Sequence, residues 1–304
     1  MTARLLDGRA VASRVWRELA ERVAALRGED RPAPRLAIVR FDATGASGVY
    51  AGSLERSARS IGIEPVVVTV AEGVALGDLA ARIGALNRDP SVAGIVVAQP
   101  VPAHLETSAV VELIAPDRDV DGATPTNAGR LARGEAAFVP ATALAVIELL
   151  HAYGIGVAGR RAVVVGRSPV VGRPVAHLLT TADATVVICH RGTRNLARET
   201  RRAEILVVAA GSPGLIRPEM VNRSAVVIDC GINTTPDGII GDVEFDAVRP
   251  VVAAISPVPG GVGPVTVMMV LRQAVEAAER AAERDASDEQ LQRFVAGAAR
   301  RVAG

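Results

Sequence analysis

A glycine-containing turn after an apolar run is the segment whose residues best suit the binding of a phosphorylated ligand. The β-rich run 161–165 opens onto 166–174 (GRSPVVGRP), and a predicted helix follows. Glycines let backbone N–H groups approach a pyrophosphate, and a helix N-terminus favours negative charge. The spacing departs from Gly-x-Gly-x-x-Gly, so the motif alone also fits a plain tight turn. Its place between a strand and a helix favours a dinucleotide site.

The residues after the next predicted strand indicate which dinucleotide would bind. About 20 residues beyond the turn, NAD sites place an acid for the ribose hydroxyls. His190, Arg191 and Arg194 stand there instead, and no acid is present. Guanidinium groups suit a 2′-phosphate, and Arg167 in the turn could add another. The pattern therefore predicts NADP; the alternative is that these arginines only solvate a loop.

Composition excludes several other classes of function. Lys plus Arg is 34 against 33 Asp plus Glu, so a net charge of +1 does not favour nucleic acid or an anionic membrane. All 34 cations are arginine, so lysine chemistry is excluded. Two cysteines are too few for a disulfide framework or a zinc site, and we expect no metal. We see no signal segment and no membrane-length apolar run, and expect a cytoplasmic protein with a small-molecule partner.

The elements that must position these residues alternate along the chain. With 304 residues, two domains are expected. In the first half we predict strands over 36–39, 65–70 and 93–97, and helices over 11–26, 50–60, 76–86 and 109–114. A turn-rich stretch over 116–129 leads to a helix over 141–153. In the second half we predict strands over 161–165, 184–189, 205–209 and 225–229, and helices over 171–179 and 265–302. The alternation predicts an α/β fold, doubly wound in the second half.

Several motifs read together resemble one enzyme family. In the second half they are 166–174, Cys189-His190, 229–233 (DCGIN), 241–243 (GDV) and, most specific, 257–266 (PVPGGVGPVT). In the first half they are Asp7-Gly8, Tyr50, 116–122 (PDRDVDG), Asn127 and 129–131 (GRL). Over nearly its whole length the chain resembles the methylenetetrahydrofolate dehydrogenase/cyclohydrolase family.

The resemblance implies a homodimeric enzyme of two three-layer α/β domains, with tetrahydrofolate bound in the cleft between them. The folate-binding catalytic domain would comprise residues 1–142, completed by the C-terminal helix 274–304. The Rossmann-type NADP-binding domain would comprise residues 143–273. The family oxidises 5,10-methylenetetrahydrofolate to the 5,10-methenyl cation with NADP, and its bifunctional members hydrolyse that cation to 10-formyltetrahydrofolate.

The resemblance also implies roles for residues at the cofactor. Gly166, Arg167 and Ser168 would hold the phosphates. Arg191 would lie by the 2′-phosphate, and Ile232 by the nicotinamide.

On the substrate side, the resemblance makes Tyr50 and Asp121 the catalytic residues. Tyr50 would stack on the folate. Asp121 would bind the pterin ring, because one carboxylate can accept hydrogen bonds from the 2-amino and ring N–H groups together. The side-chain-poor turn Pro259, Gly260 and Gly261 would form a wall against the substrate, with Val97 and Gln99 completing the substrate-binding set.

Three departures from the family pattern lie around one site, and one of them is 140–143 (PATA) in place of the family's Pro-Cys-Thr-Pro string. The family's Tyr-x-x-x-Lys signature has Leu54 at the lysine, and its Val-Gln-Leu-Pro string has Ala98 at the glutamine. Arg56 should lie about 200° around a helix from Leu54. Gln99 is shifted by one residue, which reverses the face of a strand end. Hydride transfer needs alignment and no protein base, whereas hydrolysis needs a positioned, deprotonated water. The substitutions therefore predict weak or absent cyclohydrolase activity.

Three alternatives remain at this stage. A fully bifunctional enzyme could position the attacking water with Gln99, Ser53 or an ordered water. A non-catalytic folate- or NADP-binding paralogue would bind without turnover. The apolar Leu54 and Ala98 also fit an altered, folate-like substrate.

Overall fold

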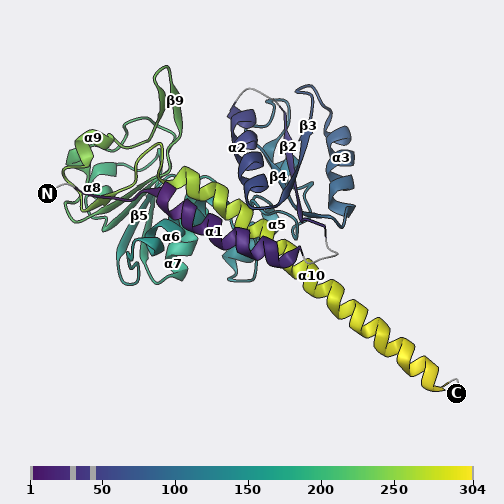
Figure 1. Ribbon diagram of the computed structural model, residues 1–304. Helices are drawn as coiled ribbons and strands as arrows, with labels where there is room; N and C mark the ends of the chain where they lie inside the picture. Colours follow the sequence, from purple (N-terminus) through teal and green to yellow (C-terminus); the bar gives the residue numbers. More distant parts are fainter. Residues whose placement is uncertain (1–2, 28–31, 42–45, 303–304) are drawn as a thin grey trace. The chain divides into compact units, whose positions relative to one another are not determined.

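The computed structural model describes residues 3–27, 32–41 and 46–302 (Figure 1). The chain forms two compact units. The first, called the six-stranded unit after its sheet, comprises residues 1–17 and 121–270. The second, called the three-stranded unit, comprises residues 18–120 and 271–304. Helices α1 (Gly8–Leu26) and α10 (Val262–Val302) contribute to both. The domain limits expected from the sequence stay a prediction.

The six-stranded unit contains a parallel sheet with the order β1-β11-β8-β7-β5-β6. Its strands are β1 (Arg4–Leu5), β5 (Arg161–Val165), β6 (Thr185–Cys189), β7 (Ile205–Val208), β8 (Val226–Asp229) and β11 (Ala254–Ile255). The four strands expected in this half are confirmed to within one residue at each end. The side chains of β5, β7 and β8 are almost all apolar because both faces of the sheet are covered there, whereas β6 at the edge is partly exposed. Strands β1 and β11, of two residues each, are too short to show an apolar pattern.

Helices on both faces complete the three layers of this unit. They are α5 (Pro125–Ala132), α6 (Ala141–Ala152), α7 (Gly172–Thr181), α8 (Leu196–Thr200), the 3-10 turn η1 (Pro218–Met220) and α9 (Phe245–Val248). On one face α7 packs against β5 and β6 and beside α6. On the other face Leu196, Met220 and Phe245 pack against a buried cluster that includes Val163 and Leu206. The expected three-layer α/β fold is confirmed here.

The expected turn-rich stretch 116–129 is wrong in its second part, because α5 begins at Pro125. Thr124 caps this helix: its side chain accepts a hydrogen bond from the Asn127 N–H at 3.3 Å. A threonine cap followed by proline at the first helical position is a common start signal. The signal stands in the sequence, but the surrounding proline, glycine and aspartate residues concealed it.

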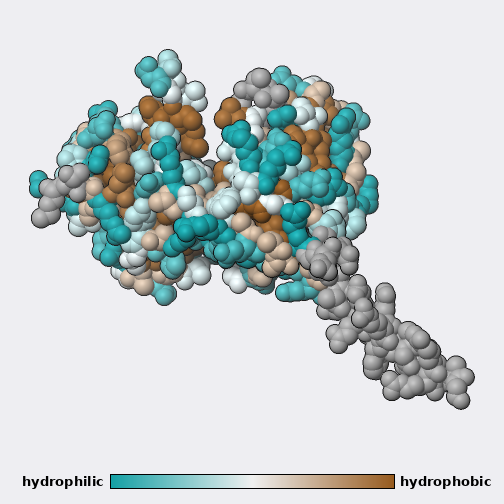
Figure 2. All heavy atoms as spheres, viewed as in Figure 1, coloured by the Kyte–Doolittle hydropathy of each residue, from teal (hydrophilic) through white to brown (hydrophobic). Residues whose placement is uncertain are grey.

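A β-hairpin that the sequence reading missed follows β8. It joins β9 (Asn233–Thr235) to β10 (Gly238–Ile240) in antiparallel register. The connecting Pro236-Asp237 and Gly238 form a strong turn signal. Ile239 and Ile240 are 44% and 42% exposed. Figure 2 shows apolar side chains gathered over the base of this hairpin.

The three-stranded unit is built on a parallel sheet of order β3-β2-β4. Its strands are β2 (Arg35–Arg40), β3 (Glu64–Thr69) and β4 (Val92–Val97), and its helices include α2 (Ala46–Ser60), α3 (Leu76–Arg88) and α4 (Thr107–Val111). Helix α2 packs against β2 and β3, whereas α3 packs against β4 and α4 (Figure 1). The two helices flank the sheet, as expected for an α/β layer.

The later parts of α1 and α10 are tied into the three-stranded unit. Arg22 and Glu279 form an ion pair at 2.6 Å, and the Gln273 Nε2 donates a hydrogen bond to the Val120 carbonyl at 2.8 Å. Within the described part of the chain, no helix has the length and apolarity to cross a bilayer.

Candidate functional site

The carboxyl ends of β5 and β7 form the switch point of the six-stranded sheet. Counted along the chain from β5, the strand order is 2-1-3-4-5, the flavodoxin-like form of a doubly wound sheet. The crossovers after β5 and β6 place α7 and α8 on opposite faces. Ligands of such folds bind outside the carboxyl ends of the strands at this point. The turn 166–174 begins there.

Close packing requires glycine at both ends of this turn. A Cβ at Gly166, whose φ is +129°, would overlap the Ala209 carbonyl after β7. A Cβ at Gly172 would overlap the Gly166 carbonyl. Between them, the Ser168 Oγ accepts a hydrogen bond from the Val171 N–H at 3.1 Å. The turn is thus a preformed cradle with a glycine at each end, at the N-terminus of α7, which fits a dinucleotide pyrophosphate.

Exposed arginines lie beside the cradle. Val165 and Cys189 are paired in the parallel register of β5 and β6, so the residues after β6 lie next to the glycine turn. The turn after β6 is closed by the His190 Nδ1, which accepts a hydrogen bond from the Gly192 N–H at 3.0 Å. Arg191 and Arg167 are exposed. The structure therefore brings the predicted phosphate turn and the predicted 2′-phosphate residue to one edge of the sheet.

Ile232 lies on the loop after β8, at the same edge of the sheet. It is 69% exposed, the largest exposed fraction among the exposed large apolar residues that the structure describes. A large apolar side chain with this exposure contributes little to stability through burial, so its presence at this position calls for another explanation. A flat apolar ligand group is one such reason.

The turn 257–261 packs against the start of α1. The Gly8 N–H donates a hydrogen bond to the Gly260 carbonyl at 2.9 Å, and a Cβ at Gly8 would overlap the Gly261 carbonyl. Gly260 has a φ of +109°. Pro259 is exposed, whereas Gly260 and Gly261 are buried. Pro257 and Val258 are partly exposed, so the turn presents two proline rings and a valine as well as backbone, and its role as a wall against the substrate stays a prediction.

Asp121 lies at the start of the six-stranded unit's second range and is partly buried. Its carbonyl accepts a hydrogen bond from the Ala141 N–H at 3.3 Å. The next residue, Gly122, has a φ of +66°, and a Cβ there would overlap the Val139 backbone. A left-handed glycine and the start of α6 therefore fix the backbone that carries this carboxylate.

Tyr50 and Leu54 lie one turn apart on α2 and differ in environment. Leu54 is completely buried with Ala51 and Ala58, and Tyr50 is partly exposed. Arg56 is exposed. The position at which the resemblance implies a lysine is therefore part of the core of this unit, and Arg56 is exposed, as the helical spacing predicts.

Residues 97–99 follow the alternation of β4. Val97 packs in the cluster with Val39 and Ile83, on the α3 side of the sheet. Ala98 is completely buried, and its N–H donates a hydrogen bond to the Val39 carbonyl at 2.8 Å. By strand alternation Ala98 faces the α2 side, on which Leu54 lies. Gln99 is exposed and does not occupy the position of Ala98.

Two buried acids near the cofactor edge had no role in the sequence reading. Asp229 ends β8 and is 3% exposed, and Asp242, after β10, is completely buried. Burial, with a smaller contribution from the charge of Asp242, raises the pKa of Asp229 to about 6 despite the lowering effect of three backbone N–H groups. An acid directly after the apolar run 225–228 is the signal that could have drawn attention to it.

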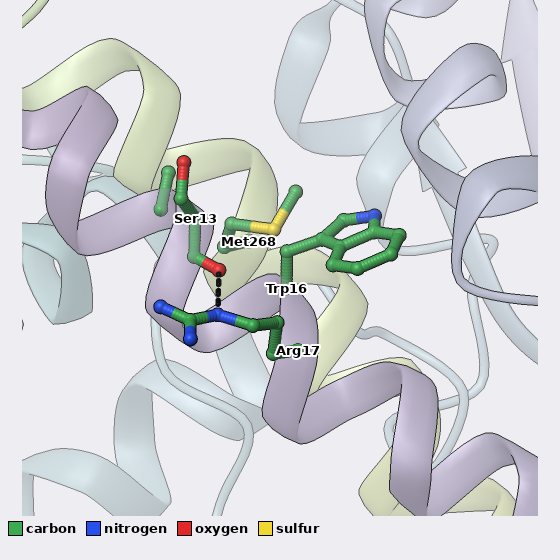
Figure 3. A pocket seen from close by; sticks show the side chains of 5 residues that line it. Ser13, Trp16, Arg17 and Met268 are labelled. Atoms are coloured by element: carbon green, nitrogen blue, oxygen red, sulfur yellow. Dashed lines mark hydrogen bonds between the residues drawn. The ribbon is translucent and has the colours of Figure 1, made fainter.

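A surface pocket of about 400 Å³ lies apart from these residues. It lies along α1 and α10 in the six-stranded unit and is lined by Ala12, Ser13, Trp16, Arg17 and Met268 (Figure 3). The Arg17 Nε donates a hydrogen bond to the Ser13 carbonyl at 3.4 Å, within the helix. The lining is mostly apolar, and no predicted site residue belongs to it.

The fold and the cradle together define a two-unit α/β protein with a Rossmann-type nucleotide-binding unit. Comparison with known proteins assigns the chain to a family. Residues 6–121 match the model of the tetrahydrofolate dehydrogenase/cyclohydrolase catalytic domain. Residues 140–282 match that family's NAD(P)-binding domain. The chain belongs to the tetrahydrofolate dehydrogenase/cyclohydrolase family.

Individual relatives are similar to this chain over most of their own length and most of its length. The bifunctional protein FolD of Bordetella avium is 47% identical over 281 residues, which are 92% of this chain and 99% of the relative. The crystal structure of the bifunctional FolD of Campylobacter jejuni has a TM-score of 0.89 at 39% identity and covers 91% of this chain and 99% of its own. The Trypanosoma brucei enzyme, whose structure was solved with NADP cofactor and inhibitor, has a TM-score of 0.88 at 37% identity. The match covers 93% of this chain and 99% of the Trypanosoma chain.

Proposed function

We propose that this protein is an NADP-dependent 5,10-methylenetetrahydrofolate dehydrogenase in which methenyltetrahydrofolate cyclohydrolase activity is weak or absent. Family membership supports the dehydrogenase chemistry. One observation carries the distinction between the two activities: Leu54 and Ala98 are both completely buried and apolar.

The cofactor half of the proposed site rests on the cradle. Gly166, Arg167 and Ser168 would hold the phosphates, with Arg191 at the 2′-phosphate and Ile232 beside the nicotinamide. Guanidinium groups can bind a phosphate with two parallel hydrogen bonds, which supports NADP over NAD. When bound, NADP⁺ supplies the hydride acceptor.

For the oxidation, the chain need only orient the substrate. The substrate's own nitrogen lone pairs stabilise the cation that forms when the methylene carbon loses hydride, so alignment counts for more than a protein base. Asp121 would accept hydrogen bonds from the pterin, Tyr50 would stack on the ring system, and the turn 259–261 would bound it.

Hydrolysis of the methenyl cation needs more than orientation. A water must be positioned and lose a proton, and a side chain in that role contributes about 10²- to 10⁴-fold in rate. Leu54 and Ala98 have no polar side-chain atom with which to do so. Arg56 and Gln99 are exposed, which argues against either taking over from the buried pair.

A time course of purified protein with 5,10-methylenetetrahydrofolate and NADP⁺ tests the proposal. NADPH and the methenyl chromophore are read separately, and 10-formyl product is compared with a control without enzyme. We expect NADPH and methenyl to rise together. If methenyl stays low and formyl product outpaces the control, the enzyme is bifunctional and our reading of Leu54 and Ala98 is wrong.

The double variant Leu54→Lys with Ala98→Gln supplies the converse test. Restoring both polar groups should raise hydrolysis at least tenfold while NADPH formation changes little. Leu54→Met is the matched control, because it keeps the site apolar, and should leave both rates unchanged. Absence of NADPH with an active substrate preparation would instead favour a non-catalytic paralogue or an altered folate-like substrate.

The setting of this activity is also a proposal. We place the protein in the cytoplasm as a homodimer whose partners are tetrahydrofolate derivatives, without nucleic acid or membrane. The net charge of +1 supports the small-molecule partner. Cys189 and Cys230 are both free thiols, which fits a reducing compartment.

A further inference from the structure

Three separate segments at the cofactor edge of the six-stranded sheet are joined by two buried carboxylates. The segments are 210–212 after β7, 230–233 after β8, and 241–243 after β10. Asp229 binds two of them: its Oδ1 accepts hydrogen bonds from the N–H groups of Gly231 at 2.8 Å and Asp242 at 3.1 Å. Its Oδ2 accepts one from the Val243 N–H at 3.0 Å.

Asp242 completes the connection to the third segment. Its Oδ2 accepts hydrogen bonds from the N–H groups of Ala210 at 2.6 Å and Gly211 at 2.9 Å. Its Oδ1 accepts hydrogen bonds from the Ser212 N–H at 2.8 Å and the Asn233 side-chain amide at 2.9 Å. Each carboxylate therefore bonds backbone donors with both of its oxygens, and charged acceptors make the stronger bonds of this kind.

The local sequence is shaped around these two side chains. A Cβ at Gly231 would overlap the Asp242 carboxylate, and a Cβ at Gly241 would overlap the Asp229 carboxylate. The Asp229 N–H in turn donates a hydrogen bond to the Ser256 Oγ at 2.8 Å, next to β11. We call Asp229 and Asp242 together the carboxylate clamp.

The clamp encloses the loop that carries Ile232. Asp229 lies three residues before Ile232, and Asn233, held by Asp242, lies directly after it. Ile232 itself is 69% exposed and receives little support from packing. The position of its side chain is therefore set by backbone held through the two carboxylates.

We propose that Asp229 and Asp242 are positioning residues for the cofactor, which hold the loop 230–233 so that Ile232 is presented to the nicotinamide end of NADP. The inference rests on the proposed function for the place of Ile232. The clamp touches neither substrate nor reacting atoms and acts through the loop.

Ionisation of Asp229 gives the clamp a distinguishing property. Among the described residues, the titratable groups that face it are Asp242, from the segment after β10, and the neighbouring Cys230 thiol. Burial raises the pKa of Asp229 to about 6. Below that pH a proton occupies one oxygen, and the clamp loses acceptor capacity for its backbone donors. We expect NADP⁺ affinity to fall as the pH drops through 6.

The test measures binding separately from turnover. NADP⁺ is titrated calorimetrically into wild type, Asp229→Asn, Asp242→Asn and the control Asp246→Asn, an exposed acid on α9. Loss of a charged acceptor to several backbone donors should weaken binding about tenfold or more in the clamp variants. In turnover we expect a raised KM for NADP⁺ and a smaller change in kcat. The NADP⁺ 2′-phosphate also titrates at about pH 6, so the pH dependence in Asp229→Asn should be smaller than in wild type and not absent.

Hydrogen exchange of segment 230–243 gives a readout without cofactor. Clamp variants should lose protection there and keep it in β5 and β7. If a clamp variant fails to fold, Asn233→Ala removes one donor to Asp242 and should show a smaller change in the same direction.

The outcomes separate the two proposals. Clamp variants that bind NADP⁺ as wild type does, with the same KM and the same pH profile, would overturn the inference. Wild type that shows no NADP⁺ binding would contradict the proposed function instead; unchanged protection of 230–243 in the variants would still contradict the clamp.

Discussion

At the scale of single residues, the glycines of the cradle are the positions with the least freedom. We expect Gly172→Ala to abolish measurable NADP⁺ binding and lower Tm, because the new methyl group would overlap the Gly166 carbonyl. Gly77→Ala in α3 is the control: nothing surrounds its Cβ position, and alanine in this first turn should leave stability unchanged or raise it by up to about 0.5 kcal/mol. Cofactor titration and thermal unfolding check both. Normal binding by Gly172→Ala would refute the cradle.

Leu54 makes a second prediction at this scale. Leu54→Ala should reduce the free energy of unfolding by about 2–5 kcal/mol, because the side chain is completely buried. Leu54→Met, similar in volume, should cost less than about 1.5 kcal/mol. Leu76, which is 40% exposed, is the comparison site, and its alanine variant should change stability little. Urea unfolding measures all three. Equal effects at Leu54 and Leu76 would mean that Leu54 is not a core residue.

At the scale of elements, α5 depends on its cap. Thr124→Ala removes the acceptor for the Asn127 N–H and should cost about 1 kcal/mol, whereas Thr124→Ser keeps the hydroxyl and should cost less. Chemical unfolding with two-state analysis compares the variants. A serine variant as unstable as the alanine variant would assign the effect to the lost methyl group.

The elements also show how far sequence reasoning reaches. Strands such as β5 and β8 could be predicted because each contains four consecutive buried residues, most of them valine or isoleucine, which form a clear apolar run. Strand β1 was missed because two residues carry no periodicity, and its pairing with β11 depends on residues about 250 positions away. The β9–β10 hairpin was missed although its turn residues stood in the sequence, because its strands are short and exposed.

The candidate site likewise contains residues that the sequence predicts and residues that it does not. The cradle is contiguous in sequence, so its glycines and arginines could be read directly. The roles of Asp121 and Tyr50 came only from the resemblance. The clamp was not found, because Asp229 and Asp242 are 13 residues apart and the backbone donors that they bind come from three loops.

At the scale of the whole molecule, Asp229 couples stability to pH. Its pKa is raised from 3.8 to about 6 in the folded protein. The folded state therefore holds the proton more tightly, so the stability contributed by the protonated group is full below pH 4 and is lost as the pH rises through 6. About two pKa units correspond to about 3 kcal/mol.

The comparison of wild type with Asp229→Asn isolates this contribution from the other carboxylates. Relative to the variant, wild type should lose stability between pH 4 and 6 and change no further above pH 7. Urea unfolding across this range measures the difference. A difference that is constant with pH would show that the pKa of Asp229 is the same in the folded and unfolded states. The clamp proposal expects NADP⁺ to bind best when Asp229 is ionised, and the stability argument makes this the less stable state of the folded protein. The two expectations together mean that cofactor binding is best where folding stability is lower.

The pocket on α1 also contains the intrinsic fluorophore of the molecule. Trp16 is the one tryptophan of the chain, so all indole emission originates from this residue. Trp16 is 37% exposed and lines the pocket together with Met268. Trp16 shares the pocket with Met268 and is partly in contact with water, so we expect its emission to respond to small changes in the packing of α1 against α10. Reduced nicotinamide absorbs where indole emits, so quenching of Trp16 would report cofactor binding without any added dye.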